Sequence, residues 1–210
     1  MKLNNYSLKV KNKQLVDNCD LNFYLGQINH IVGKNGVGKS LLAKDFLLNN
    51  SGNIPKSISQ NVTLISSSSN IPNDITKDFL LSLLKSKFEN NRQTFDKIYN
   101  ILNIEAIPSN VLLKNLSDGQ KQKLKLSFLL EDHDLIILDE VTNALDKKTV
   151  NEIYEFLNDF IQSHQTKTII NITHNLSDLS ALPGKYFIFK DLQIEEYQSK
   201  EEVINDYINL

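Results

Sequence analysis

The sequence predicts an α/β fold with a mostly parallel sheet core, antiparallel strands at the N-terminus and an inserted helical subdomain. Three observations support this class. Short apolar runs of strand type alternate with segments of helical period along much of the chain. One of these runs leads directly into a glycine-rich loop of the phosphate-binding kind. A long helical stretch without strands interrupts the alternation, which indicates an insertion into the core.

Composition sets the outer limits. The 210 residues can bury one substantial core with a subdomain, and the 23 basic and 25 acidic residues give a net charge of −2. The chain has no excess of basic residues that would indicate a nucleic-acid partner, so we expect no nucleic acid to bind. The single cysteine, Cys19, excludes an internal disulfide and suits a reducing compartment. The sequence has no apolar run near the roughly 18 residues of a membrane helix, so we expect a cytoplasmic protein.

The N-terminal segment alternates apolar and polar residues. The pattern runs through 3–10 and again through 19–25, with a polar turn at 11–14 between them. This predicts two paired strands, with Cys19 packed between strands rather than reactive. A short apolar strand is expected next, at 28–32.

The phosphate loop follows that strand and fits the pattern GxxxxGK[ST]. A triphosphate packed against backbone needs many N–H donors and little obstruction from Cβ atoms, which glycine provides. Lys39 is expected to reach the β- and γ-phosphates, and the Ser40 hydroxyl to be a ligand of Mg²⁺. The alternative is a purely structural role, in which the loop is a glycine-rich turn that binds no ligand. The residues assigned to nucleotide binding here are Gly33, Lys34, Asn35, Gly36, Val37, Gly38, Lys39, Ser40 and Leu41.

A helix is expected to open at Lys39 and to place its positive end at the phosphates. Its apolar face is assigned to four residues, Leu41, Leu42, Phe46 and Leu47.

The helical insertion separates the two parts of the core. A buried strand at 62–65 is followed by a break over 66–74, a helical period from 76 to about 103, and a third helix from near Ser117 through Leu130. We therefore divide the chain into a first core part at 1–72, a helical subdomain at 73–131 and a second core part at 132–210.

The strand and helix alternation then resumes. Strands are expected at 135–138, 168–172 and 186–189, with a helix over 147–163 and a capping box at 199–202 that opens a last helix. Apolar strands in this order favour a largely parallel sheet covered on both faces.

Residues 135–140 read LIILDE, a buried strand with two carboxylates at its carboxyl end, where α/β sheets place their ligands. Asp139 is the natural Mg²⁺ partner of Ser40. Glu140 is then placed to orient or deprotonate a water that attacks the γ-phosphate. The alternative is a strand that simply ends in an acidic turn.

Residues 116–120 read LSDGQ and resemble the LSGGQ signature of the ATP-binding-cassette ATPases, and the likeness extends over nearly the whole chain in the family's order. Residues 144–146 match that family's D-loop, and 173–174 match the switch histidine. The resemblance implies ATP and Mg²⁺ as cofactors. It also implies further site residues, namely Ser117, Gly119, Gln120, Asp146 and the catalytic His174.

The resemblance further implies a head-to-tail dimer, with itself or with a second cassette, that holds two ATP molecules. It implies the ATP-binding subunit of a transporter on the cytoplasmic face of the membrane, working with separately encoded membrane subunits, and we favour export over import. Two alternatives stay open. One is a soluble ABC ATPase outside transport, and the other is an ATP-gated binding module that hydrolyses weakly.

Four departures from the family pattern bear on these expectations. Ser66 or Ser67 stands where the family has a glutamine that reaches Mg²⁺, so the stretch 66–70 is expected to be mobile and to contact the metal poorly. The adenine-stacking aromatic falls near Val10, with Tyr6 as a displaced candidate. Asp118 replaces a glycine of the signature. Val141 replaces the usual proline, a change that we expect to be tolerated.

The remaining polar residues receive structural interpretations. His30 is expected to be a hydrogen-bonded core histidine, and His133 and His164 to lie on the surface. Three lysines, Lys121, Lys123 and Lys125, are assigned to an exposed side of the signature helix.

Overall fold

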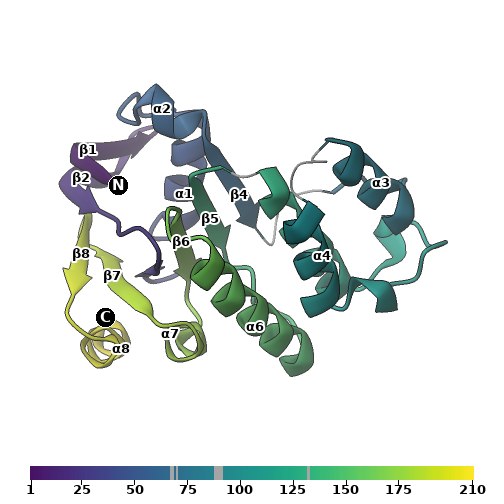
Figure 1. Ribbon diagram of the computed structural model, residues 1–210. Coiled ribbons are helices and arrows are strands. Elements are labelled where there is room, and N and C mark those ends of the chain that lie inside the picture. Colours follow the sequence, from purple (N-terminus) through teal and green to yellow (C-terminus); the bar gives the residue numbers. More distant parts are fainter. Residues whose placement is uncertain (67–68, 70, 88–91, 132) are drawn as a thin grey trace.

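The computed structural model describes residues 1–66, 69, 71–87, 92–131 and 133–210, so Ser67, Ser68 and Asn70 of the predicted mobile stretch lie outside the described residues. A six-stranded sheet in the order β4-β5-β6-β3-β7-β8 forms the centre, and β1 and β2 form a separate antiparallel pair (Figure 1). The strands from β4 to β7 in this order are parallel, and β8 pairs antiparallel with β7. The strands are β1 (Lys2–Val10), β2 (Lys13–Asn22), β3 (Ile28–Val32), β4 (Val62–Ser66), β5 (Leu135–Asp139), β6 (Thr168–Thr173), β7 (Gly184–Lys190) and β8 (Gln193–Tyr197).

The helices account for most of the remaining chain. They are α1 (Lys39–Leu48), α2 (Lys56–Ser59), α3 (Lys77–Lys87), α4 (Arg92–Ile101), α5 (Asp118–Leu126), α6 (Lys147–Ser163), α7 (Leu176–Ala181) and α8 (Lys200–Asn209), with 3-10 turns η2 (Ile104–Ala106), η3 (Leu113–Asn115) and η4 (Ser127–Glu131). The predicted bounds of α6 are confirmed. The third predicted helix is α-helical only to Leu126 and then tightens into η4. The sequence pattern did not predict α2, α7 or β8.

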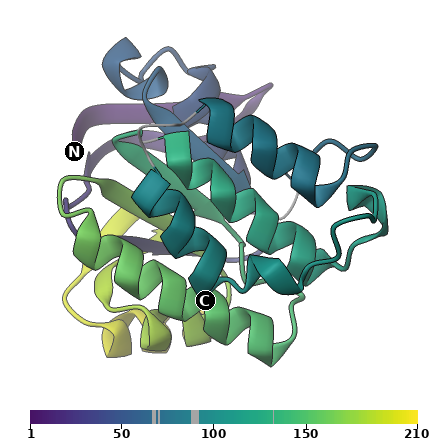
Figure 2. The ribbon, with the colours of Figure 1, turned by 45° about the vertical axis from the view of Figure 1, so that its right-hand side comes forward.

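Two apolar clusters fill the space on the two faces of the sheet. One contains side chains of α3, α4, α5 and α6 together with Ile136 and Leu138. The other contains β1, β2 and α1 together with Leu135 and Ile137. Successive residues of β5 thus face opposite layers, which explains why its sequence is continuously apolar. Figures 1 and 2 show α3 and α4 near the edge of the sheet that β4 forms, and α8 near the opposite edge, which β8 forms.

His30 is a satisfied core histidine, as predicted. It is fully buried in β3, where Nε2 lies 2.8 Å from the carbonyl oxygen of Leu182 and Nδ1 lies 3.2 Å from the side-chain amide of Asn171. Burial lowers the pKa of His30 to about 4, so the ring is neutral at physiological pH.

The N-terminal hairpin confirms the paired strands and the buried Cys19, but it removes Tyr6 as an adenine-stacking candidate. Tyr6 is 1% exposed, and its hydroxyl donates to Oδ2 of Asp45 at 2.9 Å. The reason is an irregularity between Leu3 and Tyr6, where Asn5 has φ of 53°. This bulge turns Tyr6 to the buried face that also carries Leu3.

The apolar face of α1 is narrower than predicted. Leu42, Ala43 and Phe46 are buried against the sheet, but Leu41 and Leu47 are each 40% exposed. Because a helix covers a sheet with one stripe of side chains, the two outer leucines flank that stripe instead of joining it.

The lysine assignments on α5 were wrong for two of the three residues. Lys123 and Lys125 are 9% and 8% exposed. Lys123 pairs with Glu152 of α6, and Nζ of Lys125 donates to the carbonyl oxygen of Ser66 at 3.1 Å. The helix lies between other elements, so the alkyl stems pack on apolar neighbours and the ammonium groups end at polar partners.

Two histidines expected on the surface are half-buried. His133 has its Nδ1 2.9 Å from the hydroxyl of Thr63. His164 stacks on Phe160, with ring centroids 4.0 Å apart. His133 lies just before β5 and His164 is the C-cap of α6, so both rings lie at the ends of core elements.

Candidate nucleotide-binding site

The phosphate loop connects the carboxyl end of β3 to the first turn of α1. Gly38, with φ of 122°, is the N-cap of α1 and has no side chain to satisfy the helix N–H groups. A Cβ on Gly33 would lie 2.7 Å from the carbonyl oxygen of Phe189, so only glycine fits there. The loop therefore presents backbone donors at an open helix end, which is an anion-binding arrangement.

The ammonium group of Lys39 lies against the loop itself. Its Nζ donates to the carbonyl oxygens of Gly33 at 2.7 Å and Lys34 at 3.1 Å. Burial lowers the pKa of Lys39, while the nearby carboxylates of Glu140 and Asp139 act in the opposite direction. A buried cation beside open N–H groups is suited to bind the charged oxygens of a phosphate.

The predicted metal pair is brought together. The hydroxyl of Ser40 donates to Oδ1 of Asp139 at 3.3 Å. Burial raises the pKa of Asp139, and the hydrogen bond from Ser40 opposes that rise. The described residues contain no cluster of three or more His, Cys, Asp or Glu side chains that could hold a metal. One hydroxyl and one carboxylate fit Mg²⁺, which commonly takes few protein oxygens and completes its shell with water and phosphate.

Glu140 and His174, which were predicted separately, lie side by side. Nδ1 of His174 lies 3.0 Å from Oε1 of Glu140, and both side chains are partly exposed. The topology explains the contact, because β5 and β6 are parallel neighbours and these residues follow their carboxyl ends. Glu140 adopts φ of 55°, and its backbone N–H donates to the carbonyl oxygen of Ile172 at 2.9 Å.

The signature segment starts α5 with a complete capping box. Oγ of Ser117 accepts from the backbone of Gln120 at 3.2 Å, and Oε1 of Gln120 accepts from the backbone of Ser117 at 3.0 Å. Gly119 lies against α6, since a Cβ there would lie 3.1 Å from Oγ1 of Thr149. The carboxylate of Asp146 accepts two hydrogen bonds from the same Thr149, one from the backbone N–H at 3.0 Å and one from the hydroxyl at 2.7 Å. These bonds lower the pKa of Asp146.

The predicted residues thus form two groups. One joins the phosphate loop with Asp139, Glu140 and His174, and the other joins Ser117, Gly119 and Gln120 to Asp146 through the start of α6. Within the described ranges, no hydrogen bond or ion pair connects the two groups. Lys34 differs from the expectation in one respect, because its ammonium group also donates to the carbonyl oxygen of Leu210.

Sequence reasoning missed a buried contact beneath this site. Thr142 and Tyr154 both donate hydroxyl hydrogen bonds to the carboxylate of Asp178. No motif contains Asp178, and an acidic residue on a short helix gives no sequence signal of burial.

The family model for "ABC transporter" matches residues 16–143. The chain belongs to the ABC transporter family. This ATP-binding cassette is an ATPase, like the other members. It is 61% identical over 210 residues to the "Probable peptide export ATP-binding protein YydI" of Bacillus subtilis, which covers all of both chains. It is 30% identical to the "Zinc import ATP-binding protein ZnuC" of Wolbachia pipientis, covering 90% of this chain and 78% of the relative.

A solved structure, "Dimeric structure of a post-hydrolysis state of the ATP-binding cassette MJ0796 bound to ADP and Pi", has the same fold as this cassette. Its TM-score is 0.72 at 20% identity, over 93% of this chain and 97% of that one. Among the described residues of the cassette, no helix is both long and apolar enough to cross a membrane.

Proposed function

We propose that this cassette hydrolyses ATP with Mg²⁺ to power the export of a peptide through separately encoded membrane subunits. The observation that carries this proposal is the 61% identity, over the full length of both chains, to a protein named for peptide export. The zinc import relative is half as similar, which is why we favour export.

Each residue of the site has a role in this proposal. Lys39 and the backbone N–H groups that follow Gly38 would hold the β- and γ-phosphates, and Ser40 with Asp139 would hold Mg²⁺. Bound there, the metal would neutralise charge on the phosphate oxygens. Glu140 accepts a proton from the attacking water. His174, which lies 3.0 Å from the Glu140 carboxylate, keeps that carboxylate oriented.

We further propose that two cassettes act head to tail. In this arrangement Ser117, Gly119, Gln120 and Asp146 of one chain complete the site of the other. The solved structure of the cassette MJ0796 is described as dimeric, which supports a pairing of two cassettes. The exposed start of α5 would then approach a γ-phosphate, as the start of α1 does within its own chain.

The binding-module alternative has one observation in its favour. Asp118 places a carboxylate in the exposed first turn of α5, where it would repel a γ-phosphate about 6 Å away by up to roughly 3 kcal/mol at an effective dielectric near 20. Solvent screening reduces that figure because the residue is exposed. Slow hydrolysis in a stable ATP-bound dimer would favour this alternative.

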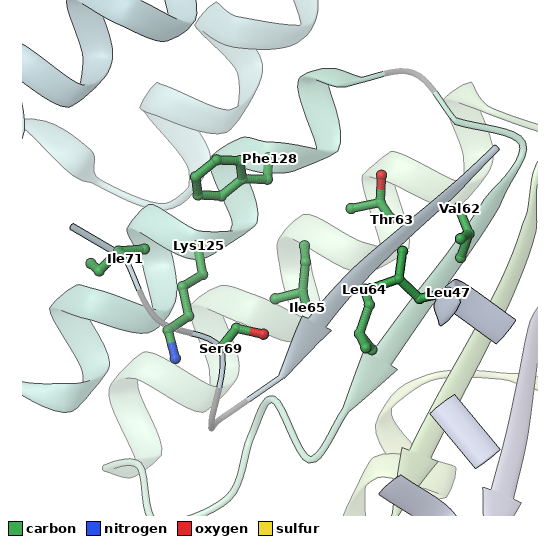
Figure 3. A pocket seen from close by; sticks show the side chains of 9 residues that line it. All are labelled: Leu47, Val62, Thr63, Leu64, Ile65, Ser69, Ile71, Lys125 and Phe128. Carbon is green, nitrogen blue, oxygen red and sulfur yellow. The ribbon is translucent and has the colours of Figure 1, made fainter. Parts of the chain in front are cut away.

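We propose that the membrane subunit docks on an apolar hollow of about 260 Å³ (Figure 3). It lies between the end of α1, the edge strand β4 and the turn η4. Its lining consists of Leu47, Val62, Thr63, Leu64, Ile65, Ser69, Ile71, Lys125 and Phe128. Figure 3 places Leu47 and Leu64 at one end of the hollow and Ile71 and Lys125 at the other. Most of this lining is buried, and its apolar side chains that reach the surface are Leu47, which is 40% exposed, and the partly exposed Leu64 and Phe128. Apolar side chains that gather at the surface are typical of a partner interface.

Two neighbouring leucines of α1 provide the experiment. Leu47 lines the hollow, whereas Leu48 is more exposed, at 60%, and does not line it. We expect ATP turnover to rise several-fold when membrane subunits are added in lipid vesicles. Leu47→Arg should lose this stimulation, and Leu48→Arg should keep it. Rapid turnover that no membrane fraction changes would instead favour the soluble alternative, and equal stimulation of both variants would remove the hollow as the docking place.

A further inference from the structure

Asp178, on α7, is a buried acid outside the set of predicted site residues. It is 1% exposed and accepts hydrogen bonds from Oγ1 of Thr142, at 2.9 Å and 3.1 Å to its two oxygens. The hydroxyl of Tyr154 donates to Oδ1 at 2.6 Å. No cation of the described residues forms an ion pair with it. Burying a carboxylate costs free energy unless it is hydrogen-bonded. The hydroxyl groups of Thr142 and Tyr154 therefore stabilise the Asp178 carboxylate, and their bonds to it fix the positions of both side chains.

The segments that Asp178 connects also carry the catalytic pair. Thr142 lies two residues after Glu140, and Asp178 lies four residues after His174. The side chains of Glu140 and His174 are themselves 3.0 Å apart. The loop after β5 and the segment after β6 are therefore linked twice, once at the partly exposed site and once in the buried layer beneath it.

The loop that carries Glu140 needs such a link. Glu140 and Ala144 have φ of 55° and 58°, in the left-handed region that side chains with a Cβ rarely adopt. Such a conformation persists only where the surroundings fix it. Backbone bonds hold the beginning of the loop, from Glu140 to Ile172 and from Asn143 to Glu140.

The outer side of the same loop gives little support. It borders an open hollow of about 690 Å³ whose lining includes Thr142, Ala144 and His174. The bond from Thr142 to Asp178 therefore holds the middle of the loop from the inner side. Tyr154, on α6, fixes the carboxylate that makes this bond.

We propose that Asp178 is a positioning residue for ATP hydrolysis. Through Thr142 it fixes the loop 140–145, so that the carboxylate of Glu140 stays aligned with His174 and with the attacking water. This inference rests on the proposed role of Glu140 as the base. It predicts an effect on the rate of the chemical step and not on the binding of ATP, because the phosphate loop is untouched.

The test compares two substitutions of one residue in the full chain. Thr142→Val keeps the shape of the side chain and removes the hydroxyl, so kcat should fall by about tenfold to a hundredfold while KM for ATP changes by less than about twofold. Thr142→Ser keeps the hydroxyl and should stay within about twofold of the parental kcat. Tyr154→Phe should lower kcat less, since Asp178 then keeps the bond from Thr142.

A second buried acid provides the matched control for stability. Asp45 is also 1% exposed and accepts from the hydroxyls of Tyr6 and Ser51, as Asp178 does from those of Tyr154 and Thr142, but it lies at the far end of α1. Asp178→Asn should therefore lower kcat much more than Asp45→Asn at a comparable loss of melting temperature. If Asp178→Asn does not fold, the Val and Ser variants at Thr142 still decide the question.

The possible failures are distinguishable. If Thr142→Val retains the parental kcat, or if Asp178→Asn lowers it no more than Asp45→Asn, the positioning role is overturned. If Glu140→Gln hydrolyses ATP at the parental rate, the proposed base is wrong, whatever the Thr142 variants do. A fall in kcat for Thr142→Val together with recovery in Thr142→Ser supports the inference.

Discussion

The first turns of α1 and α5 begin at the two motifs that would hold one ATP from opposite sides, and they are built differently. Gly38 precedes α1, which has no side-chain cap and no acidic residue in its first turn. Ser117 and Gln120 close the start of α5 with two hydrogen bonds, and Asp118 adds a negative charge to that turn. The start of α1 has no side-chain cap for its N–H groups, whereas the Ser117 hydroxyl of α5 already accepts from one N–H of its first turn, that of Gln120.

The difference between the two helix starts indicates that α1 serves mainly to bind ATP and α5 mainly to join two cassettes. The start of α1 has no side-chain cap and carries the buried ammonium group of Lys39. The start of α5 is already stable in the single chain, so an approaching phosphate gains less there. We therefore expect one cassette to bind ATP mainly through α1, and α5 to contribute when a second cassette arrives.

Lys39→Ala is expected to have the largest effect on this comparison. Removing a desolvated charge that faces phosphate costs about 2–5 kcal/mol, so the affinity for ATP should fall by roughly thirtyfold or more. The melting temperature of the nucleotide-free protein should change little, because relief from the unfavourable burial of this charge opposes the loss of its two hydrogen bonds to the loop carbonyl oxygens. Titration calorimetry and thermal unfolding measure the two effects.

Lys44 provides the control, since it is exposed on the same helix and lies outside the loop. Lys44→Ala should bind ATP as the parental chain does. Undiminished binding and turnover in Lys39→Ala would mean that the open end of α1 is not the phosphate site.

Glu140→Gln should have the next largest effect and should connect the two helix ends. It keeps the shape of the side chain and removes its ability to take a proton, so hydrolysis should fall by about a hundredfold to ten-thousandfold while ATP still binds. The trapped ATP would then bridge α1 of one chain and α5 of the other. Light scattering after size exclusion, with and without ATP and Mg²⁺, should detect a dimer.

Two results would contradict this expectation. A Glu140→Gln chain that stays monomeric with ATP demonstrably bound would remove the shared site. A chain that keeps the parental rate would remove Glu140 as the base. A parental protein that stays dimeric with intact ATP for hours would favour the binding module instead.

The parts of the site that the sequence could predict are those whose chemistry dictates local spacing. The loop at 33–40 and the strand that ends in Asp139 and Glu140 need fixed residue types in a fixed order, and the structure brings Ser40 to Asp139 and Glu140 to His174. The burial of Leu135 to Leu138 in β5 followed from the continuous apolar run of that strand.

Contacts set by tertiary packing were beyond the sequence pattern. A bulge at Asn5 reversed the face of Tyr6, and the partners of Lys123 and Lys125 come from segments distant in the chain. The same holds for Asp178, whose two donors come from a loop and a helix that the topology places beside it. Local period and propensity do not encode such neighbours.

Ser117→Ala should have the smallest effect, and it tests the closed end of the comparison. The substitution removes the acceptor for the backbone N–H of Gln120, which lies 3.2 Å away. Loss of a serine cap costs about 1 kcal/mol, or about 2–4 °C in melting temperature for a chain of this size. In the Glu140→Gln background, the ATP-dependent dimer should also weaken several-fold, because the hydroxyl that would face the γ-phosphate is gone.

Ser199 separates these two consequences of the Ser117 change. It caps α8 in the same way, with Oγ accepting from the backbone of Glu202 at 3.2 Å, and it belongs to no predicted site. Ser199→Ala should lower the melting temperature by a similar amount and leave the dimer unchanged. If both variants weaken the dimer equally, Ser117 acts only through stability, and the closed start of α5 is a structural cap that does not meet the phosphate. If only Ser117→Ala weakens it, the cap hydroxyl serves both purposes.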